Sequence, residues 1–358
     1  MVTCSGYSWA GIMYTIEGNG LTRDYFVYVS GEAVRLAKAE TEALLAIGAE
    51  EIVVEWTGRL GRFSSKSDVT SFLLERAAFI KSSGRVLAEF REIEDIPRSN
   101  LMGAIDESET FAVRVLRLGE CDGEGVGDDL PAHIGSLLLK YNKAEVSLDN
   151  PDNLFLVICS TDGLLLTISE ESRTRKLLGL REPGRKRFFH PSMMNAKLAR
   201  AMCNLARIMP GDLVLDPFCG GGGILCEVTL IGATAIGVDL DWSLLMGARI
   251  NLGNPGELRS CLVQADAKYC PVHSCDCIVT DPPYGRSSST RGRRAKRLVS
   301  GFLENVDGIL EKGGRLCFCA STDMNLLDVV TDLGIEIETV INLRVHSGLV
   351  RQVFSLVI

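Results

Sequence analysis

The second half of the chain alternates short apolar segments with amphipathic ones, and this pattern constrains the fold more than any other feature. β-Branched runs occur at 213–215, 234–238, 261–265, 275–280 and 315–320, with helical patterns between them and a predicted helix at 192–209. Runs of this length are typical of strands buried on both faces of a parallel sheet. The closing segments, 335–345 and 351–358, flank a turn containing Gly348. We therefore expect an α/β, Rossmann-like sheet over 190–358 that ends in an antiparallel hairpin.

The first half of the chain has a mixed order of elements. Strands are predicted at 25–29, 51–56, 85–90, 111–118, 145–148, 154–159 and 164–168, and helices at 33–47, at 69–80 and from Pro131 onward. This order suits two small α+β units, which we place at 1–90 and 91–168, with 1–23 as an extension. A linker is expected at 169–189.

Composition limits the class of protein. The chain has 358 residues, of which 46% are hydrophobic and 23% charged, as in a soluble protein of two or three domains. It has neither a long apolar run nor a signal-like start, so we expect a cytoplasmic protein with no membrane span. Twelve cysteines invite a disulfide or zinc interpretation, but no C-x-x-C pair exists and only four histidines are present. Reduced, buried cysteines and no metal are the favoured expectation.

The net charge of −8 argues against a protein coated in nucleic acid, yet two segments are locally basic. The linker contains Arg173, Arg175, Lys176, Arg181, Arg185, Lys186 and Arg187. A predicted loop at 286–297 holds no acid and contains Arg286, Arg291, Arg293, Arg294, Lys296 and Arg297. Both segments are either solvated surface or strips that contact phosphate groups, which would supply affinity for RNA without choosing a base.

A glycine-rich turn follows the first strand of the C-terminal unit, in the segment Asp216-Pro217-Phe218-Cys219 and the four glycines 220–223. It lacks the lysine of a triphosphate-binding loop, so a nucleoside triphosphate is not expected. Asp239 and Asp266 end the next two strands. Each acid alone could be an ordinary turn residue, but three at successive strand ends suit a cationic adenosine ligand such as S-adenosylmethionine, with Asp239 on the ribose.

A rigid turn, Asp281-Pro282-Pro283-Tyr284, ends the fourth strand. Two prolines fix the backbone and leave the Pro282 carbonyl free to accept a hydrogen bond. Asp281 and this carbonyl can therefore accept the two N–H groups of an exocyclic amine, while Tyr284 stacks on the base. The turn predicts catalysis at an amino group.

These motifs together resemble the class I S-adenosylmethionine-dependent amino-methyltransferases. The segments 187–193, 198–202, 30–32 and 36–40 narrow the resemblance to the archaeal tRNA guanosine-10 N2-methyltransferases. The resemblance implies an N-terminal ferredoxin-like domain and a THUMP RNA-binding domain at 91–168. It places cofactor-binding residues at Phe188, His190, Pro191, Asp216, Pro217, Gly220, Gly222, Asp239 and Asp266. It places catalysis at Asp281, Pro282, Pro283 and Tyr284.

The expected function is a tRNA guanine-N2 methyltransferase that uses S-adenosylmethionine and adds one or two methyl groups at guanosine 10. An adenine-N6 or other RNA or DNA amino-methyltransferase, and an RNA-binding module with an inactive methyltransferase domain, remain as alternatives. A protein-amide methyltransferase would need neither the THUMP-like unit nor the basic strips. We expect tRNA as the partner and a monomer, and leave open whether another protein binds.

Overall fold

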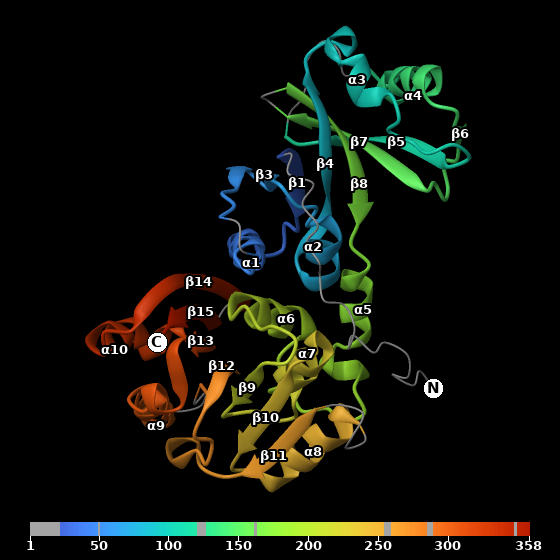
Figure 1. The fold of residues 1–358 in the computed structure, drawn as a ribbon. Helices are drawn as coiled ribbons and strands as arrows, with labels where there is room; N and C mark the ends of the chain where they lie inside the picture. The colour runs from blue at the N-terminus through green and yellow to red at the C-terminus, as the bar shows by residue number, and fades with distance from the viewer. Residues whose placement is uncertain are drawn as a thin grey trace.

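The computed structural model describes residues 22–48, 51–119, 127–160, 163–253, 259–284, 289–346 and 349–358, with no side-chain description for 289–294 and 345–346. Its strands form two sheets, an eight-stranded one from the first half of the chain and a seven-stranded one from the second half. Figure 1 shows the two sheets at opposite ends of an elongated molecule, with helices α5 (Thr174–Leu180) and α6 (Ala196–Leu205) between them.

The N-terminal sheet has the strand order β2-β3-β1-β4-β8-β7-β5-β6. Its strands are β1 (Arg23–Val29), β2 (Glu55–Thr57), β3 (Leu60–Ser65), β4 (Ile80–Phe90), β5 (Thr110–Arg117), β6 (Glu145–Val146), β7 (Asn153–Ser160) and β8 (Gly163–Glu171). The long strand β4 pairs with β1 on one side and β8 on the other, so both predicted N-terminal units contribute to one continuous sheet. The division at residue 90 stays a prediction.

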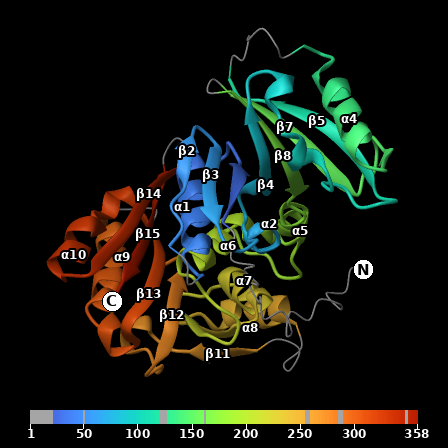
Figure 2. The same cartoon turned by 45° about the horizontal axis from the view of Figure 1, so that its top comes forward.

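Four helices pack on this sheet, namely α1 (Val34–Leu45), α2 (Thr70–Arg76), α3 (Arg98–Leu101) and α4 (Leu130–Tyr141). The apolar stripe of α1 is buried through Leu36 and Leu44, as its three- and four-residue spacing predicts. Ile134 and Leu138 of α4 are buried in a separate cluster, beside the edge-to-face pair of Phe111 and Phe155. Figure 2 shows α4 lying along β5 at the far end of the sheet.

The C-terminal sheet has the strand order β11-β10-β9-β12-β13-β15-β14. Its strands are β9 (Leu213–Asp216), β10 (Thr234–Asp239), β11 (Ser260–Gln264), β12 (Cys275–Thr280), β13 (Leu310–Ser321), β14 (Glu336–His346) and β15 (Leu349–Val357). The first five strands in this order are parallel, whereas β15 is antiparallel to both β13 and β14. The predicted parallel sheet with a terminal antiparallel hairpin is confirmed.

Helices cover both faces of this sheet: α6, α7 (Gly223–Ile231), α8 (Trp242–Leu252), α9 (Ser289–Leu303) and α10 (Leu326–Asp332). Consecutive strand residues point to opposite faces, so Leu316 and Phe318 belong to one core cluster while Cys317 and Cys319 belong to the other. Each of the ten cysteines in the described part of the chain is free, and eight of them are buried in the core as small apolar side chains, with Cys270 partly buried and Cys261 exposed.

Several predicted elements differ in the structure. The helix expected at 69–80 ends at Arg76, and β4 begins at Ile80. The expected strand at 51–56 is replaced by the β2–β3 hairpin, and the helix expected at 192–209 extends only over Ala196–Leu205. The basic segment expected as a loop is mostly helical, because α9 begins at Ser289. Arginine and lysine are good helix formers. The segment contains so many of them that its few apolar residues do not show a clear helical spacing.

A buried polar network joins the two halves of the molecule. Glu40 of α1 accepts hydrogen bonds from the Ala78 and Phe79 amides at 2.8 and 2.9 Å and from Asn204 Nδ2 of α6 at 2.7 Å. Arg76 of α2 donates to Asn204 Oδ1 at 2.8 Å and to the Ile208 carbonyl. The helices of the first half are therefore docked on the C-terminal sheet through fully satisfied polar groups as well as apolar contacts.

Candidate active site

The carboxyl ends of the parallel strands bring four predicted site residues to one edge of the C-terminal sheet. β9 ends at Asp216, β10 ends at Asp239, and Asp281 follows the last residue of β12. Asp266 comes two residues after the end of β11. The order β11-β10-β9-β12 makes these four strands neighbours, as a ligand crevice outside the strand ends requires.

The glycine-rich turn connects β9 to α7 at the centre of this edge. Gly220 and Gly222 have φ of 49° and 76°, a left-handed conformation that favours glycine. A Cβ on Gly222 would stand 3.0 Å from the Cβ of Ala248, whereas nothing lies within 4 Å of the equivalent position on Gly220. The turn thus packs closely on α8 and leaves space beside Gly220.

Asp239 holds this turn in place. Its Oδ2 accepts the Gly220 amide at 2.8 Å, and its Oδ1 accepts the Asp241 amide at 2.9 Å. The residue is partly exposed, and a carboxylate oxygen can accept a second hydrogen bond. Asp239 can therefore anchor the turn and still accept hydroxyl groups of a bound nucleoside.

Asp216 is buried beneath the same turn, with only 2% of its surface exposed. Its Oδ1 accepts the Thr280 hydroxyl at 2.6 Å and the Phe218 amide at 3.1 Å, so the carboxylate ties β9 to β12. Burial raises the pKa of Asp216 to about 7, and the nearby Asp281 and Asp239 carboxylates also raise it. In the structure Asp216 is thus hydrogen-bonded to other residues of the protein, and its direct contact with a cofactor stays a prediction.

Asp266 caps a short helical turn, Ala267–Tyr269, by accepting the Lys268 amide at 2.9 Å. It is partly exposed at the β11 end of this sheet edge, and its role at an adenine stays a prediction.

The segment before the glycine-rich turn packs against α8. Asn251 of α8 accepts the Phe188 amide at 2.9 Å and donates to the carbonyls of Phe188 at 3.0 Å and Gly221 at 2.9 Å. The Phe188 ring lies so close to Gly247 that a Cβ there would stand 2.2 Å from two ring carbons. Asn251 and Gly247 thereby fix Phe188 beside the turn, and no local sequence motif had marked either residue.

His190 and Pro191 follow Phe188 in the same segment. His190 Nδ1 lies 2.7 Å from the Ser192 hydroxyl, and Pro191 is exposed at the surface. Pro217 is buried within the turn itself. The predicted contacts of these residues with a cofactor stay predictions.

The Asp281-Pro-Pro-Tyr turn is partly buried against the terminal hairpin. The Tyr284 hydroxyl donates to Asp281 Oδ1, and the guanidinium of Arg351 lies over the Tyr284 ring with Cζ 5.3 Å from its centroid. Arg351 Nη2 is 3.7 Å from Asp281 Oδ2. Burial raises the pKa of Tyr284 above its ordinary value, so the hydroxyl is protonated at neutral pH. Stacking of a base on Tyr284 stays a prediction.

The cations of the predicted linker have different surroundings. Arg181 makes a two-pronged ion pair with the buried Glu227, at 2.8 and 3.0 Å, and Arg175 lies 3.7 Å from Glu32. Arg181 is therefore a structural residue and not part of a free strip. Of the remaining linker cations, Lys186 is partly buried, and those exposed to solvent are Arg173, Lys176, Arg185 and Arg187.

Of the second basic segment, Arg286 and the side chains of Arg291, Arg293 and Arg294 lie outside the described residues. Lys296 is partly buried and donates to the Asn325 carbonyl at 3.3 Å, while Arg297 is exposed.

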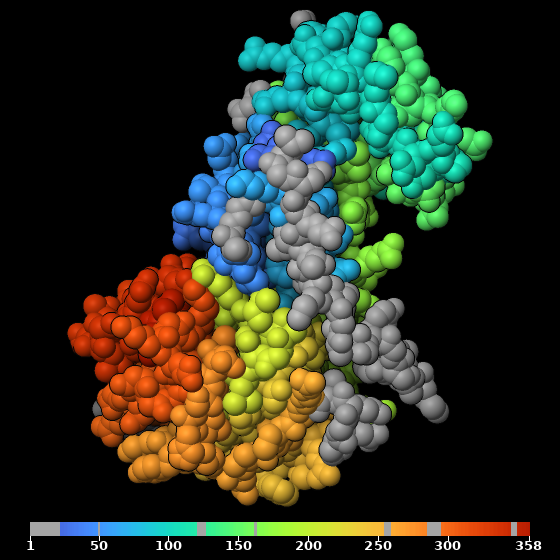
Figure 3. All heavy atoms as spheres, in the orientation of Figure 1, coloured from blue at the N-terminus to red at the C-terminus, as the bar shows by residue number. Residues whose placement is uncertain are grey.

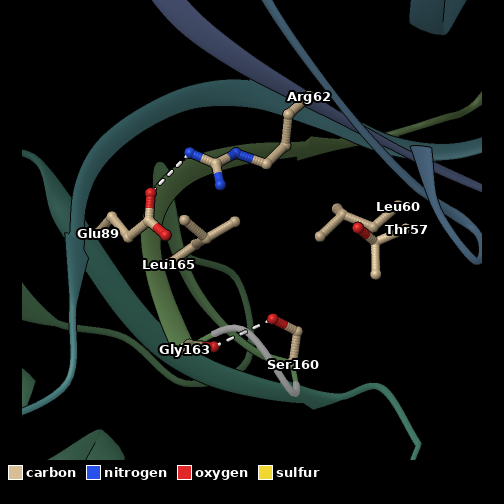
Figure 4. Close-up of a pocket in the computed structure, with 7 residues that line it drawn as sticks. All are labelled: Thr57, Leu60, Arg62, Glu89, Ser160, Gly163 and Leu165. Carbon is tan, nitrogen blue, oxygen red and sulfur yellow. Dashed lines mark hydrogen bonds and ion pairs between the residues drawn. The ribbon is translucent and has the colours of Figure 1, made fainter. Parts of the chain in front are cut away.

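A shallow pocket occurs elsewhere, in the N-terminal sheet (Figure 4). Arg62 and Glu89 form an ion pair of 2.8 Å across it, and the carboxyl-edge acids take no part in it. Its lining comprises Thr57, Leu60, Arg62, Glu89, Ser160, Gly163 and Leu165. Figure 3 places this region and the C-terminal sheet in separate parts of the molecule.

In the described ranges, no group of three or more acids, histidines or cysteines could hold a metal ion. The helices within those ranges include none that is long and apolar enough to cross a bilayer.

The fold and the edge residues together define a class I methyltransferase: a seven-stranded sheet with one antiparallel strand, a glycine-rich turn after its first strand, and an acid after the second. Residues 183–353 match the family described as RMKL-like, methyltransferase domain.

Comparison with curated proteins narrows the class. A tRNA (guanine(10)-N2)-dimethyltransferase of Methanocaldococcus jannaschii is 36% identical over 260 residues, covering 70% of this chain and 71% of that protein. One from Methanothermobacter thermautotrophicus is 30% identical over 335 residues, covering 92% and 97%. The chain belongs to this family of tRNA (guanine(10)-N2)-dimethyltransferases. The crystal structure of TrmN from Thermus thermophilus is 20% identical, with a TM-score of 0.49 over 93% of this chain and 99% of that one.

Proposed function

We propose that the protein transfers methyl groups from S-adenosylmethionine to the N2 amine of guanosine 10 in tRNA, first once and then a second time. The observation that carries this proposal is the position of Asp281 at the end of β12, two strands from Asp239 in the same sheet. The curated relatives are named tRNA (guanine(10)-N2)-dimethyltransferases, which supports guanosine 10 as the target. An amine-binding turn and a nucleoside-binding acid then share one crevice.

The residues at the strand ends fit S-adenosylmethionine. The open space beside Gly220 admits a ligand next to the backbone, and Asp239 can accept hydrogen bonds from ribose hydroxyls. Asp266 is available to the adenine, and Phe188, His190 and Pro191 lie on the segment that precedes the turn. When bound, S-adenosylmethionine supplies an electrophilic methyl group on a sulfonium.

Asp281 would act on the target amine. Its carboxylate accepts one N–H group and the Pro282 carbonyl accepts the other, which directs the nitrogen lone pair away from the purine ring. A guanine within a helix must leave its stack to reach this position, since the acceptors lie inside the crevice. Holding the amine in line with the methyl group accounts for much of the rate, because orientation converts an encounter into an intramolecular step.

The exposed cations Arg173, Lys176, Arg185 and Arg187 support tRNA as the substrate. They lie on the connection between the two sheets, so a backbone bound there would pass from the N-terminal sheet toward the crevice. We assign the N-terminal sheet to tRNA binding on this basis.

Nucleoside mass spectrometry of tRNA tests the proposal directly. Incubation of the protein with unmodified tRNA and S-adenosylmethionine should yield N2-methylguanosine and then N2,N2-dimethylguanosine, and a transcript with adenosine at position 10 should stay unmodified. The Asp281→Ala variant should bind S-adenosylmethionine and tRNA but form neither product. Methylated adenosine, or methylation that persists in the position-10 variant, would show that another base is the target.

A further inference from the structure

We propose that Arg351 is a positioning residue for methyl transfer, which fixes Asp281 and Tyr284 and keeps the Asp281 carboxylate ionised as an acceptor for the target amine. This inference deepens the proposed function and rests on it.

The topology of the sheet places Arg351 at the same sheet edge as Asp281, although the two are 70 positions apart in the sequence. β15 runs antiparallel to its neighbours, so its first residues lie at the edge where the parallel strands end. Arg351 is paired with Ser321, the last residue of β13, and with Leu343 of β14. A parallel strand in this position would have placed its first residues at the opposite edge.

Arg351, Asp281 and Tyr284 contact one another. Its guanidinium lies against the Tyr284 ring and faces Asp281 Oδ2, while the Tyr284 hydroxyl donates to Asp281 Oδ1. Each carboxylate oxygen is thus restrained by a different partner. This arrangement limits rotation of the carboxylate, which a group that must orient an amine requires.

The surroundings of Arg351 strengthen its attraction to Asp281. The Arg351 and Asp281 side chains are only 14% and 13% exposed, so water screens their attraction weakly. Burial lowers the pKa of Arg351, but the negative charge of Asp281 opposes this effect and the net shift is upward, so the guanidinium remains charged. Within the described residues, the buried Arg351 Nε has no hydrogen-bond partner.

The charge of Arg351 also decides what Asp281 can do. Among the described residues, the groups that interact with Asp281 include the Tyr284 hydroxyl, the Cys319 thiol and the Asp216 carboxylate. Of these three, Asp216 is the group whose charge opposes ionisation of Asp281 near neutral pH. Arg351 opposes that effect. Because a guanidinium does not give up its proton, it acts as a fixed charge and takes no part in proton transfer. At neutral pH Asp281 is then an ionised acceptor, which can bind the N–H group of the amine and take the proton that the nitrogen loses when it gains the methyl group.

Two variants of Arg351 and one matched control test this inference. Arg351→Met removes the charge, and Arg351→Lys restores the charge without the flat guanidinium. The control is Arg315→Met, which removes another partly buried arginine of the same sheet, paired with Glu338 at the opposite end of the β13–β15 pairing. Steady-state methylation of tRNA, calorimetric binding of S-adenosylmethionine and the melting temperature are measured for each.

We expect Arg351→Met to lower kcat about 100-fold, since a small misplacement of a catalytic group has effects of this size. The KM for tRNA and the affinity for S-adenosylmethionine should change less than about threefold, in keeping with a role realised during the reaction. Arg351→Lys should recover part of the lost kcat. In Arg351→Met the acid limb of the pH profile of kcat should move to higher pH, because a carboxylate without its counter-charge takes up a proton more readily. Arg315→Met should lower the melting temperature while kcat stays within about threefold of the parent.

The inference is wrong if kcat of Arg351→Met is close to that of the parent, if Arg315→Met loses as much kcat, or if the acid limb does not move. Where Arg351→Met does not fold, the pH profile and kcat of Arg351→Lys decide between the outcomes: a normal rate contradicts the role of the flat guanidinium. A parent protein that methylates no tRNA contradicts the proposed function instead, so the two failures are distinct.

Discussion

At the scale of single residues, three acids of similar sequence context have different surroundings. Asp239 is partly exposed and anchors the glycine-rich turn, Asp216 is buried beneath it, and Asp281 is held by an arginine and a tyrosine. All three acids lie at one edge of the sheet because they follow the ends of parallel strands, but burial and hydrogen bonding decide which of them is free to bind a ligand. Two predictions follow from Asp239 and Asp216.

Asp239→Ala should weaken S-adenosylmethionine binding by about 1.5–3 kcal/mol, the range for hydrogen bonds to a charged group. Calorimetry measures this change. Asp241→Ala is the matched control, because Asp241 caps α8 by accepting the Ser243 and Leu244 amides and has no assigned ligand. That variant should lose about 1 kcal/mol of stability and keep its cofactor affinity. Equal affinities of Asp239→Ala and the parent would place the ribose elsewhere.

Binding of S-adenosylmethionine should strengthen as the pH rises through about 7. The raised pKa of Asp216 means that the apo protein holds a proton there at pH 6, and a cationic ligand favours the ionised carboxylate. Calorimetry between pH 6 and 8 should therefore show increasing affinity and proton release on binding. Asp216→Asn keeps an oxygen for Thr280 and Phe218 but cannot ionise, so its affinity should be flat over this range. A pH dependence that persists in this variant would assign the effect to another group.

At the scale of elements, α8 decides the position of the segment before the glycine-rich turn. Asn251 binds both Phe188 and Gly221, and Gly247 leaves room for the Phe188 ring. A helical glycine is normally unfavourable by comparison with alanine, so its presence here has a packing reason.

Gly247→Ala should destabilise the fold by about 1–3 kcal/mol and weaken S-adenosylmethionine binding, because the added Cβ displaces the Phe188 ring. Chemical denaturation and calorimetry measure the two effects. Gly301→Ala in α9 is the matched control, since nothing lies within 4 Å of its added Cβ. It should gain about 0.5–1 kcal/mol of stability. Destabilisation in both variants would mean that the Phe188 contact is not the cause.

At the scale of the whole molecule, a protein of net charge −8 can bind an anionic substrate only where cations are concentrated. The exposed cations of the connection between the sheets are such a place, and the buried contacts of Glu40, Arg76 and Asn204 hold the two halves on either side of it in a fixed relation.

Replacing Arg173, Lys176, Arg185 and Arg187 together by alanine should weaken tRNA binding at low salt. Each phosphate contact contributes about 0.7–0.9 to the slope of log affinity against log salt, so the slope should decrease by up to about 3.6. Lys312→Ala, exposed near the amino end of β13, should leave the slope unchanged. The methylated nucleotide should remain the same in both. Superimposed slopes would show that these cations are only solvated surface.

The sequence by itself determined the strand–helix alternation, the parallel sheet and the place of Asp216, Asp239 and Asp281 at its edge, because period and strand-end position are local properties. It also carried the family resemblance, which the comparisons confirm. The β2–β3 hairpin was missed since β2 has only three residues, too few positions to show a period.

Only the tertiary structure decided which distant residues complete the site. Arg351 reaches Asp281 through the antiparallel direction of β15, and Asn251 reaches Phe188 through the packing of α8. It also showed that Arg181 is bound to Glu227 and is not part of a free basic strip. Strand direction, helix packing and ion pairing depend on residues far apart in the chain, so no local pattern of charge or apolarity specifies them.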